Sequence, residues 1–226
     1  MKNHFITLSE EILTLAKAGE DTTSIRRQLY FTRQSQLKKS LYADDLKKAF
    51  WINIYNAFYF IICQETNESS KTLSIKRIKI SHNLLSLNDI RHGILRKYKF
   101  KTGFGYITNP FYSSFIKTAA VDKVDYRIHF ALTSFNLKNI SVDTYDSKEI
   151  EQQLSTATKI FLQLKTQIAH DSKIIHVSDF ILYNLKDFGG KKSIKKIMET
   201  IFNTDFSTYR LRFKIEKQID KIIMAS

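Results

Sequence analysis

The chain has 226 residues, of which 43% are hydrophobic, with one proline and six glycines. This composition supports a folded core and excludes a linker, a disordered tail or a chain of short turns. The formal net charge of +14 admits a nucleic acid or an anionic surface as a partner, whereas a single cysteine excludes a disulfide within the chain.

Helices dominate the predicted first third of the chain. Thr7 and Glu10 form a capping-box pattern at the start of a first helix, and a second helical stretch runs from about residue 23 to 41. Asp44 and Asp45 then offer a cap for a long helix over about residues 45–64. Because apolar residues cover almost its whole circumference, we expect this helix to be central and buried.

The middle of the chain predicts short elements. Residues 73–75 and 78–80 alternate like strands, and a short helix follows over residues 86–96. The aromatic stretch 100–112 contains glycines and a proline, which is typical of a loop or an irregular hairpin. Residues 127–133 alternate with period two and predict a strand.

The last third of the chain predicts alternating helices and strands. These are a helix opened by Asp146 and Glu149 with apolar residues in register to Ile168, a strand over 174–177, a helix from Ser178 to about Gly189, a helix over 193–202 and a strand over 209–215. The fold class is therefore α+β, a helix-rich single domain around a small, mainly antiparallel sheet. Within residues 1–226 we distinguish a helical portion 1–45, a core 46–190 and a carboxy-terminal helix and strand 191–226.

Three stretches carry a resemblance to a known family. The sequence WINIYNA over residues 51–57, LNDIRHGILR over 87–96 and RIHFAL over 127–132 occur in that order. They resemble the signature motifs of the family called domain of unknown function 547, with weaker likeness continuing to about residue 190. The resemblance implies a family found in bacteria, plants and animals whose biochemical role is unsettled.

The chain departs from the family pattern after the third motif. There the family usually has Asn-Cys-Gly and then Ser-Cys-Pro, whereas this chain has Ser134 and Asn139 at the two cysteine positions. The resemblance therefore implies that any disulfide, metal or thiol chemistry of that loop is absent here. We expect no cofactor, and no His and Cys spacing fits a metal site.

Four residues are the candidate site. Asn53 and Asn56 share a helix face, as a polar pocket wall or as a buried network bonded to nearby backbone, and most buried polar groups are satisfied internally. In a regular strand Arg127 and His129 point to the same side. His129 is a candidate general base or a satisfied core histidine. Together the four could form a pocket that holds an anion.

Three functions follow from these residues. The favoured one is a non-catalytic binding or interaction module, degenerate relative to its family, whose partner is a small anionic ligand or a protein. The alternative is a hydrolase- or transferase-like enzyme that uses His129 with Asn53, Asn56 and Arg127. Nucleic-acid binding is a second alternative, which the dispersed lysines disfavour, since 27 Lys accompany only 9 Arg.

The sequence also bears on location. Its first residues lack the apolar stretch of a secretory signal. The longest apolar stretch, residues 50–63, is interrupted by two asparagines and is shorter than the about 20 residues that span a bilayer. We therefore expect a soluble protein of the bacterial cytoplasm with no membrane span.

Overall fold

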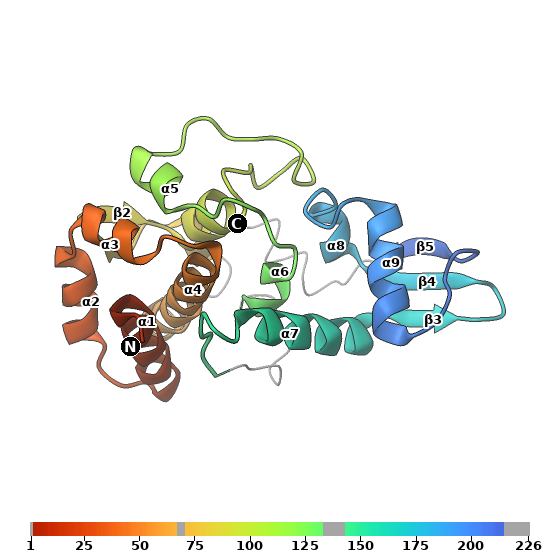
Figure 1. The fold of residues 1–226 in the computed structure, drawn as a ribbon, viewed down its shortest axis with the longest axis horizontal. Coiled ribbons are helices and arrows are strands. Elements are labelled where there is room, and N and C mark those ends of the chain that lie inside the picture. Colours follow the sequence, from red (N-terminus) through yellow and green to blue (C-terminus); the bar gives the residue numbers. More distant parts are fainter. Residues whose placement is uncertain (1, 67–70, 133–142, 215–226) are drawn as a thin grey trace.

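The structure is a computed structural model that describes residues 2–66, 71–132 and 143–214 (Figure 1). Helices predominate in this part of the chain, and two small sheets accompany them. The buried apolar residues form one contiguous cluster that reaches from Phe5 to Phe206. The α+β, helix-rich fold class predicted from the sequence is thereby confirmed.

The amino-terminal part consists of four helices. They are α1 His4–Ala18, α2 Thr23–Phe31, α3 Gln34–Ser40 and α4 Asp44–Thr66. The predicted helix over residues 23–41 is thus two helices, because the backbone is extended at Thr32 and Arg33. The predicted capping box is also displaced, since the Asn3 side chain caps α1 by accepting from the Phe5 N–H.

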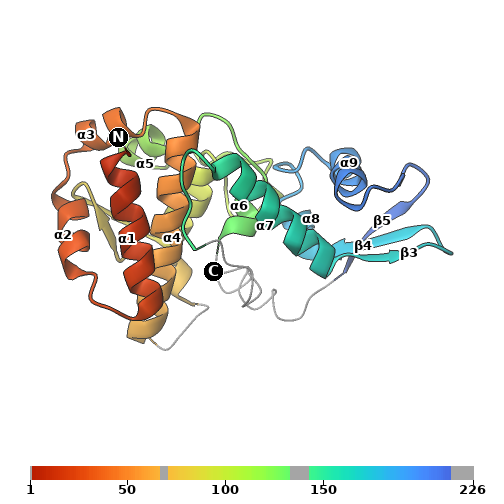
Figure 2. The same cartoon turned by 60° about the horizontal axis from the view of Figure 1, so that its bottom comes forward.

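The long helix α4 is the central buried helix that the sequence predicts. Its residues from Ala49 to Phe58 are all buried, and α1 packs along its length (Figure 2). Burial on all sides explains why the helix carries apolar side chains around its circumference. Two acidic residues, Asp44 and Asp45, lie in its first turn, where they complement the positive end of the helix dipole.

Short elements follow α4 in the middle of the chain. They are the 3₁₀ helix η1 Lys71–Ser74, the strands β1 Ile78–Ile80 and β2 Asn83–Leu85, the π-helix η2 Asp89–Leu95, and the helices α5 Ser114–Ala119 and α6 Ile128–Ala131. Strands β1 and β2 form an antiparallel hairpin. Residues 71–74 therefore form a helical turn where a strand over 73–75 was expected.

The strand predicted over residues 127–133 is wrong, because residues 128–131 form helix α6. A turn starts this helix: the Asp125 carboxylate accepts from the Arg127 N–H, and the Asp125 carbonyl accepts from the Ile128 N–H. All of residues 128–132 are buried. The polar residues of the alternating pattern therefore do not face solvent, as they would in a half-exposed strand. Thr133 and Ser134 lie outside the described residues.

The carboxy-terminal part packs helices against a three-stranded sheet (Figure 1). Its elements are α7 Ile150–Lys165, β3 Gln167–Ala169, β4 Ile174–Ser178, α8 Asp179–Tyr183, α9 Lys191–Phe202 and β5 Arg210–Lys214. Strand β3 pairs antiparallel with β4, and β5 pairs parallel with β4. Ile168, expected in the helix, lies in β3, whereas the predicted strands over 174–177 and 209–215 correspond to β4 and β5.

Candidate functional site

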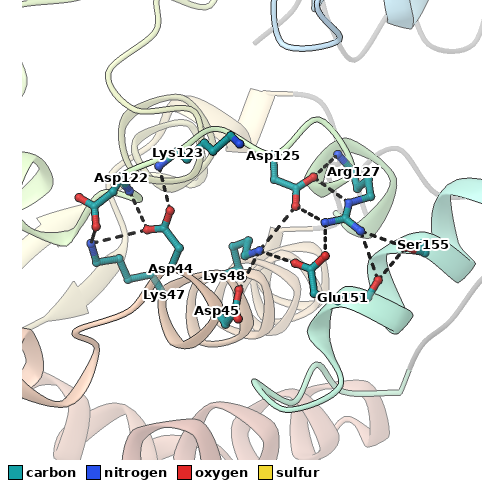
Figure 3. Close-up of polar contacts among 10 residues, drawn as sticks. All are labelled: Asp44, Asp45, Lys47, Lys48, Asp122, Lys123, Asp125, Arg127, Glu151 and Ser155. Atoms are coloured by element: carbon teal, nitrogen blue, oxygen red, sulfur yellow. Dashed lines mark hydrogen bonds and ion pairs between the residues drawn. The ribbon is translucent and has the colours of Figure 1, made fainter. Parts of the chain in front are cut away.

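The segment before α6 is fastened to the start of α4. The Asp44 carboxylate accepts hydrogen bonds from the backbone N–H groups of Asp122 and Lys123, at 2.6 and 2.8 Å. These bonds carry the chain across the end of α4 and place Asp125 and Arg127 between α4 and α7 (Figure 3). A carboxylate expected to cap its own helix thus caps a distant loop instead.

Arg127 lies in a network of ion pairs that joins α4, α6 and α7. Its guanidinium donates to both Asp125 carboxylate oxygens, to Glu151 Oε2 at 2.6 Å and to Ser155 Oγ at 2.9 Å (Figure 3). Lys48 completes the network by donating to Glu151 Oε1 at 2.9 Å. The guanidinium of Arg127 is therefore already engaged by the protein.

The network fixes the charge of its members. The hydrogen bond to Asp125 is the largest cause that raises the pKa of Arg127. Burial works to lower the pKa of Lys48, but the hydrogen bonds to Glu151 and Asp45 raise it overall. The hydrogen bonds from Arg127 and then from Lys48 lower the pKa of Glu151. All three side chains are consequently charged near neutral pH.

A cleft of about 700 Å³ opens beside this network. Its lining comes from α4, residues 123–127, α7 and α9, and consists of Asp44, Lys48, Lys123, Val124, Asp125, Tyr126, Arg127, Glu151, Ser155, Thr158, Ser193, Lys196, Ile197, Thr200 and Ile201. This volume lies in the range of small-molecule sites, about 300–1,000 Å³. We call it the α7–α9 cleft.

Two lysines in the α7–α9 cleft differ from the rest of its charged residues. Within the described part of the chain, no hydrogen bond or ion pair engages the side-chain ammonium of Lys123 or Lys196. The Lys123 side chain extends toward Asp125 but carries no contact at its end (Figure 3). The acids of the cleft, in contrast, all bond to cations or to backbone N–H groups. The uncommitted charge in the cleft is therefore positive.

His129 lies elsewhere, in a fully buried polar cluster. Asp187 Oδ2 accepts hydrogen bonds from Arg96 Nε at 2.5 Å and from His129 Nε2 at 2.9 Å. Arg96 Nη1 in turn donates to His92 Nδ1 at 2.8 Å. Asp187 thus bonds to two partners that lie 91 and 58 residues away in the sequence.

Burial sets the charges of this cluster. It lowers the pKa of His129 to about 4, despite the opposing pull of Asp187, and it lowers the pKa of His92 well below the usual value. Burial acts to raise the pKa of Asp187, but the hydrogen bonds from His129 and Arg96 hold this pKa below its usual value. Near neutral pH the cluster is thus an ionised Asp187–Arg96 pair with two neutral imidazoles.

Gly105 closes this cluster on one side. A Cβ at this position would lie 2.9 Å from Asp187 Oδ1 and 3.0 Å from Arg96 Nη2, and the glycine has a φ of +82°. Both the space and the backbone conformation therefore require glycine. Two buried nitrogens here, Arg96 Nη2 and His129 Nδ1, have no hydrogen-bond partner within the described part of the chain.

Asn53 and Asn56 are buried and bonded to backbone groups. Asn53 donates to the Tyr145 carbonyl at 2.8 Å and accepts from the Tyr145 N–H at 2.8 Å. Asn56 donates to the Ala131 carbonyl at 3.0 Å, which joins α4 directly to α6. Each amide thus tethers a segment distant in the sequence, as expected of the buried network rather than of a pocket wall.

The four candidate residues are not brought into one cavity. Arg127 lines the α7–α9 cleft, whereas Asn53, Asn56 and His129 are buried and are not among its lining residues. The expectation that Arg127 and His129 face the same way was wrong, because two residues apart on a helix point in nearly opposite directions.

The sequence analysis missed Lys48, Lys123, Glu151 and Lys196 as residues of the cleft. Glu151 and Ser155 are four apart on α7, a spacing that places them on one helix face. Such spacing shows that the two side chains share a face, but not which distant cation that face meets. The partners of Glu151 come from α4 and α6, and no local pattern links them.

Neither a membrane-spanning helix nor a group of metal ligands occurs among the described residues. No helix there is both long and apolar enough to cross a bilayer. Over residues 2–66, 71–132 and 143–214, no three His, Cys, Asp or Glu side chains are grouped as ligands of a metal ion.

Comparison with known proteins gives one match. A family model described as "Protein of unknown function, DUF547" matches residues 39–162, more than half of the chain. The matched range contains α4, η2, α6 and most of α7, which carry the three motifs and the ion-pair network. No curated protein and no solved structure matches the chain.

Proposed function

Because the chain belongs to the DUF547 family, whose function is unknown, we propose its role from the site itself: a non-catalytic module that binds a small anionic ligand in the α7–α9 cleft. The ligand class is a carboxylate or a phosphate of modest size. One observation carries the proposal. Lys123 and Lys196 line a cleft of about 700 Å³ and have no acidic partner among the described residues.

The remaining lining of the cleft supports the same class of ligand. Ser193 lies on α9 beside Lys196 and offers a hydroxyl donor, whereas the Thr200 hydroxyl already donates to the Lys196 carbonyl. Arg127 is not itself the anion-holding group, because Asp125 and Glu151 engage its guanidinium. It instead positions the loop that carries Lys123, so we propose that it contributes to binding through that loop.

A non-catalytic role is supported by the residue types present. The lining contains neither His nor Cys, and its carboxylates are bonded to cations or backbone. A carboxylate held by a cation has a lowered pKa and is a weak base near neutral pH. The lining therefore supports recognition of charge better than proton transfer.

A thermal-shift titration tests the proposal, with inorganic phosphate and citrate as probes at constant ionic strength. Binding at about ten times the dissociation constant stabilises the folded protein by about 1.4 kcal/mol, a rise in Tm of about 3–5 °C. We expect the double variant Lys123→Gln, Lys196→Gln to lose this rise.

The matched control is Lys39→Gln, Lys159→Gln, which removes two exposed charges outside the cleft. It should keep the rise in full. Equal loss in both double variants would assign the effect to net charge alone and would contradict the proposal, as would wild-type protein that neither probe stabilises.

The enzyme alternative is favoured by one observation. Asp187 accepts a hydrogen bond from the His129 Nε2–H group. The Nδ1 atom then carries the lone pair and has no partner within the described part of the chain. A carboxylate that orients an imidazole in this way is typical of general-base histidines. Against this stands the exposure of the ring, which is 0%.

Modification of histidines by diethylpyrocarbonate distinguishes the two roles. His4, His82 and His170 are exposed and should react, whereas a structural His129 should stay protected. Rapid modification of His129 in the folded protein would show that a reagent reaches it and would favour catalysis.

A further inference from the structure

A second cleft, of about 490 Å³, lies between α2, the middle of α4 and β1. Backbone hydrogen bonds fix these elements to one another, because the N–H groups of Ser81 and His82 donate to the carbonyls of Leu29 and Tyr30. This cleft shares no lining residue with the α7–α9 cleft. We call it the α2–β1 cleft.

Positive charge dominates the α2–β1 cleft. Four of its seven lining residues are cations, namely Arg26, Arg27, Arg77 and Lys79, and none is acidic. Three of the nine arginines in the chain therefore meet in one hollow. A general bias in composition explains dispersed lysines, but it does not explain why three of the few arginines line the same cleft.

The described carboxylate that pairs with cations of this cleft neutralises little of their charge. Glu65 lies 3.3 Å from Arg26 and 4.0 Å from Arg77, and its side chain is 46% exposed. Exposed pairs of this kind are weak because solvent screens them, and here one carboxylate is shared by two guanidinium groups. Within the described part of the chain, Arg27 and Lys79 have no ion-pair partner.

Two aromatic rings and Thr23 form the rest of the cleft. Tyr30 lines it and packs against His82 and Phe31, with ring centroids 4.8 and 4.9 Å away. Phe58 lies beneath the Arg26 guanidinium at 5.8 Å. A partly buried ring beside several cations offers a stacking surface next to anion-binding groups.

We propose that the α2–β1 cleft binds an organic di- or triphosphate of the nucleotide class. Arginine suits this ligand because its planar fork pairs with phosphate oxygens in a bidentate manner. Arg27, Arg77 and Lys79 hold the phosphate groups, and Tyr30 meets the ring of the ligand. The cleft volume fits one small ligand. This site is independent of the α7–α9 cleft.

Isothermal titration with ATP and with inorganic triphosphate tests the proposal, both without metal ions. We expect the double variant Arg27→Gln, Lys79→Gln to weaken both ligands at least tenfold. The matched control, Arg212→Gln with Lys159→Gln, removes the same charges from exposed positions outside the cleft and should bind like wild type. The Lys123→Gln, Lys196→Gln protein should also bind like wild type, which separates this site from the first.

The ring is tested by Tyr30→Leu, with the fold checked by circular dichroism. We expect weaker ATP binding and unchanged triphosphate binding, because only ATP has a base to stack. Equal affinities of the Arg27→Gln, Lys79→Gln protein and its control would overturn the proposal. A single-stranded oligonucleotide that binds more tightly than ATP, with affinity rising with length, would overturn it in favour of nucleic acid.

Discussion

Asp187 and Glu151 each join two bases, and they do so in opposite surroundings. Asp187 connects Arg96 and His129 with a side chain that is 2% exposed, whereas Glu151 connects Lys48 and Arg127 with one that is 60% exposed. Solvent screens the second set and not the first. We therefore expect the buried cluster to stabilise the fold strongly and the exposed network to stabilise it weakly, although their connectivity is similar.

The buried cluster also leaves its histidines neutral, while the surface network keeps every member charged. Charge near the surface costs little, since water remains close by. In this cluster the Asp187–Arg96 pair compensates its own burial, and the imidazoles stay uncharged. Burial therefore holds the two histidines neutral, whereas hydrogen bonds and ion pairs keep the members of the surface network charged.

The largest loss of stability is expected from Asp187→Asn. It removes one charge from a buried pair and leaves Arg96 without a counterion, which costs about 3–5 kcal/mol of unfolding free energy. Urea denaturation at pH 7 measures the loss, and a variant too unstable to fold agrees with it. A loss below about 1 kcal/mol would contradict the assignment of Asp187 as a structural partner of Arg96.

The next largest effect is expected from acid pH, which should reduce the stability contributed by the buried cluster before that of the surface network. Unfolded His129 takes up its proton near pH 6.5 and the folded form only near pH 4, so the unfolded state binds more protons between these values. Stability is therefore full above pH 6.5 and falls by roughly 3 kcal/mol as the pH drops to about 4. His92 acts in the same direction.

Urea denaturation between pH 7.5 and pH 4 checks this, with His129→Gln as the comparison. That variant should lose less stability over the window than wild type. Identical pH profiles would show that His129 is not buried in its neutral form. Glu151 affects only the acid end of this window, because its pKa is lowered and its share of stability is lost only as the pH falls below about 4.5.

The smallest effect is expected from Glu151→Gln, the surface counterpart of Asp187→Asn. Exposed ion pairs contribute about 1 kcal/mol or less, and salt screens them. Urea denaturation at low salt should show this loss, and 0.5 M NaCl should shrink it while leaving the effect of Asp187→Asn unchanged. A loss equal to that of Asp187→Asn would abolish the distinction between the clusters.

Sequence periodicity predicted the elements whose burial is uniform or one-sided. Helix α4 is apolar around its circumference, and the structure buries it on all sides. Strands β4 and β5 also lie where the sequence predicts strands. In these elements local pattern and tertiary environment agree, so a one-dimensional reading is sufficient.

The same reading failed at α6 and β3. Residues 128–132 alternate in polarity but are all buried, and His129 Nε2 donates to a carboxylate 58 residues away. Ile168 continues the helical register of α7, yet it pairs with Ile175 in a sheet. In both cases a contact distant in sequence outweighed the local preference.

The sequence alone determined the helix-rich α+β class, the central helix and membership of the family, because these depend on residue order and hydrophobic pattern. Only the tertiary structure decided that Asp187 meets Arg96 and His129, that Arg127 meets Glu151, and that three arginines share a hollow. The physical reason is that the strength of an electrostatic interaction depends on the distance between the charges and on their depth from solvent. The local spacing of residues in the sequence determines neither quantity.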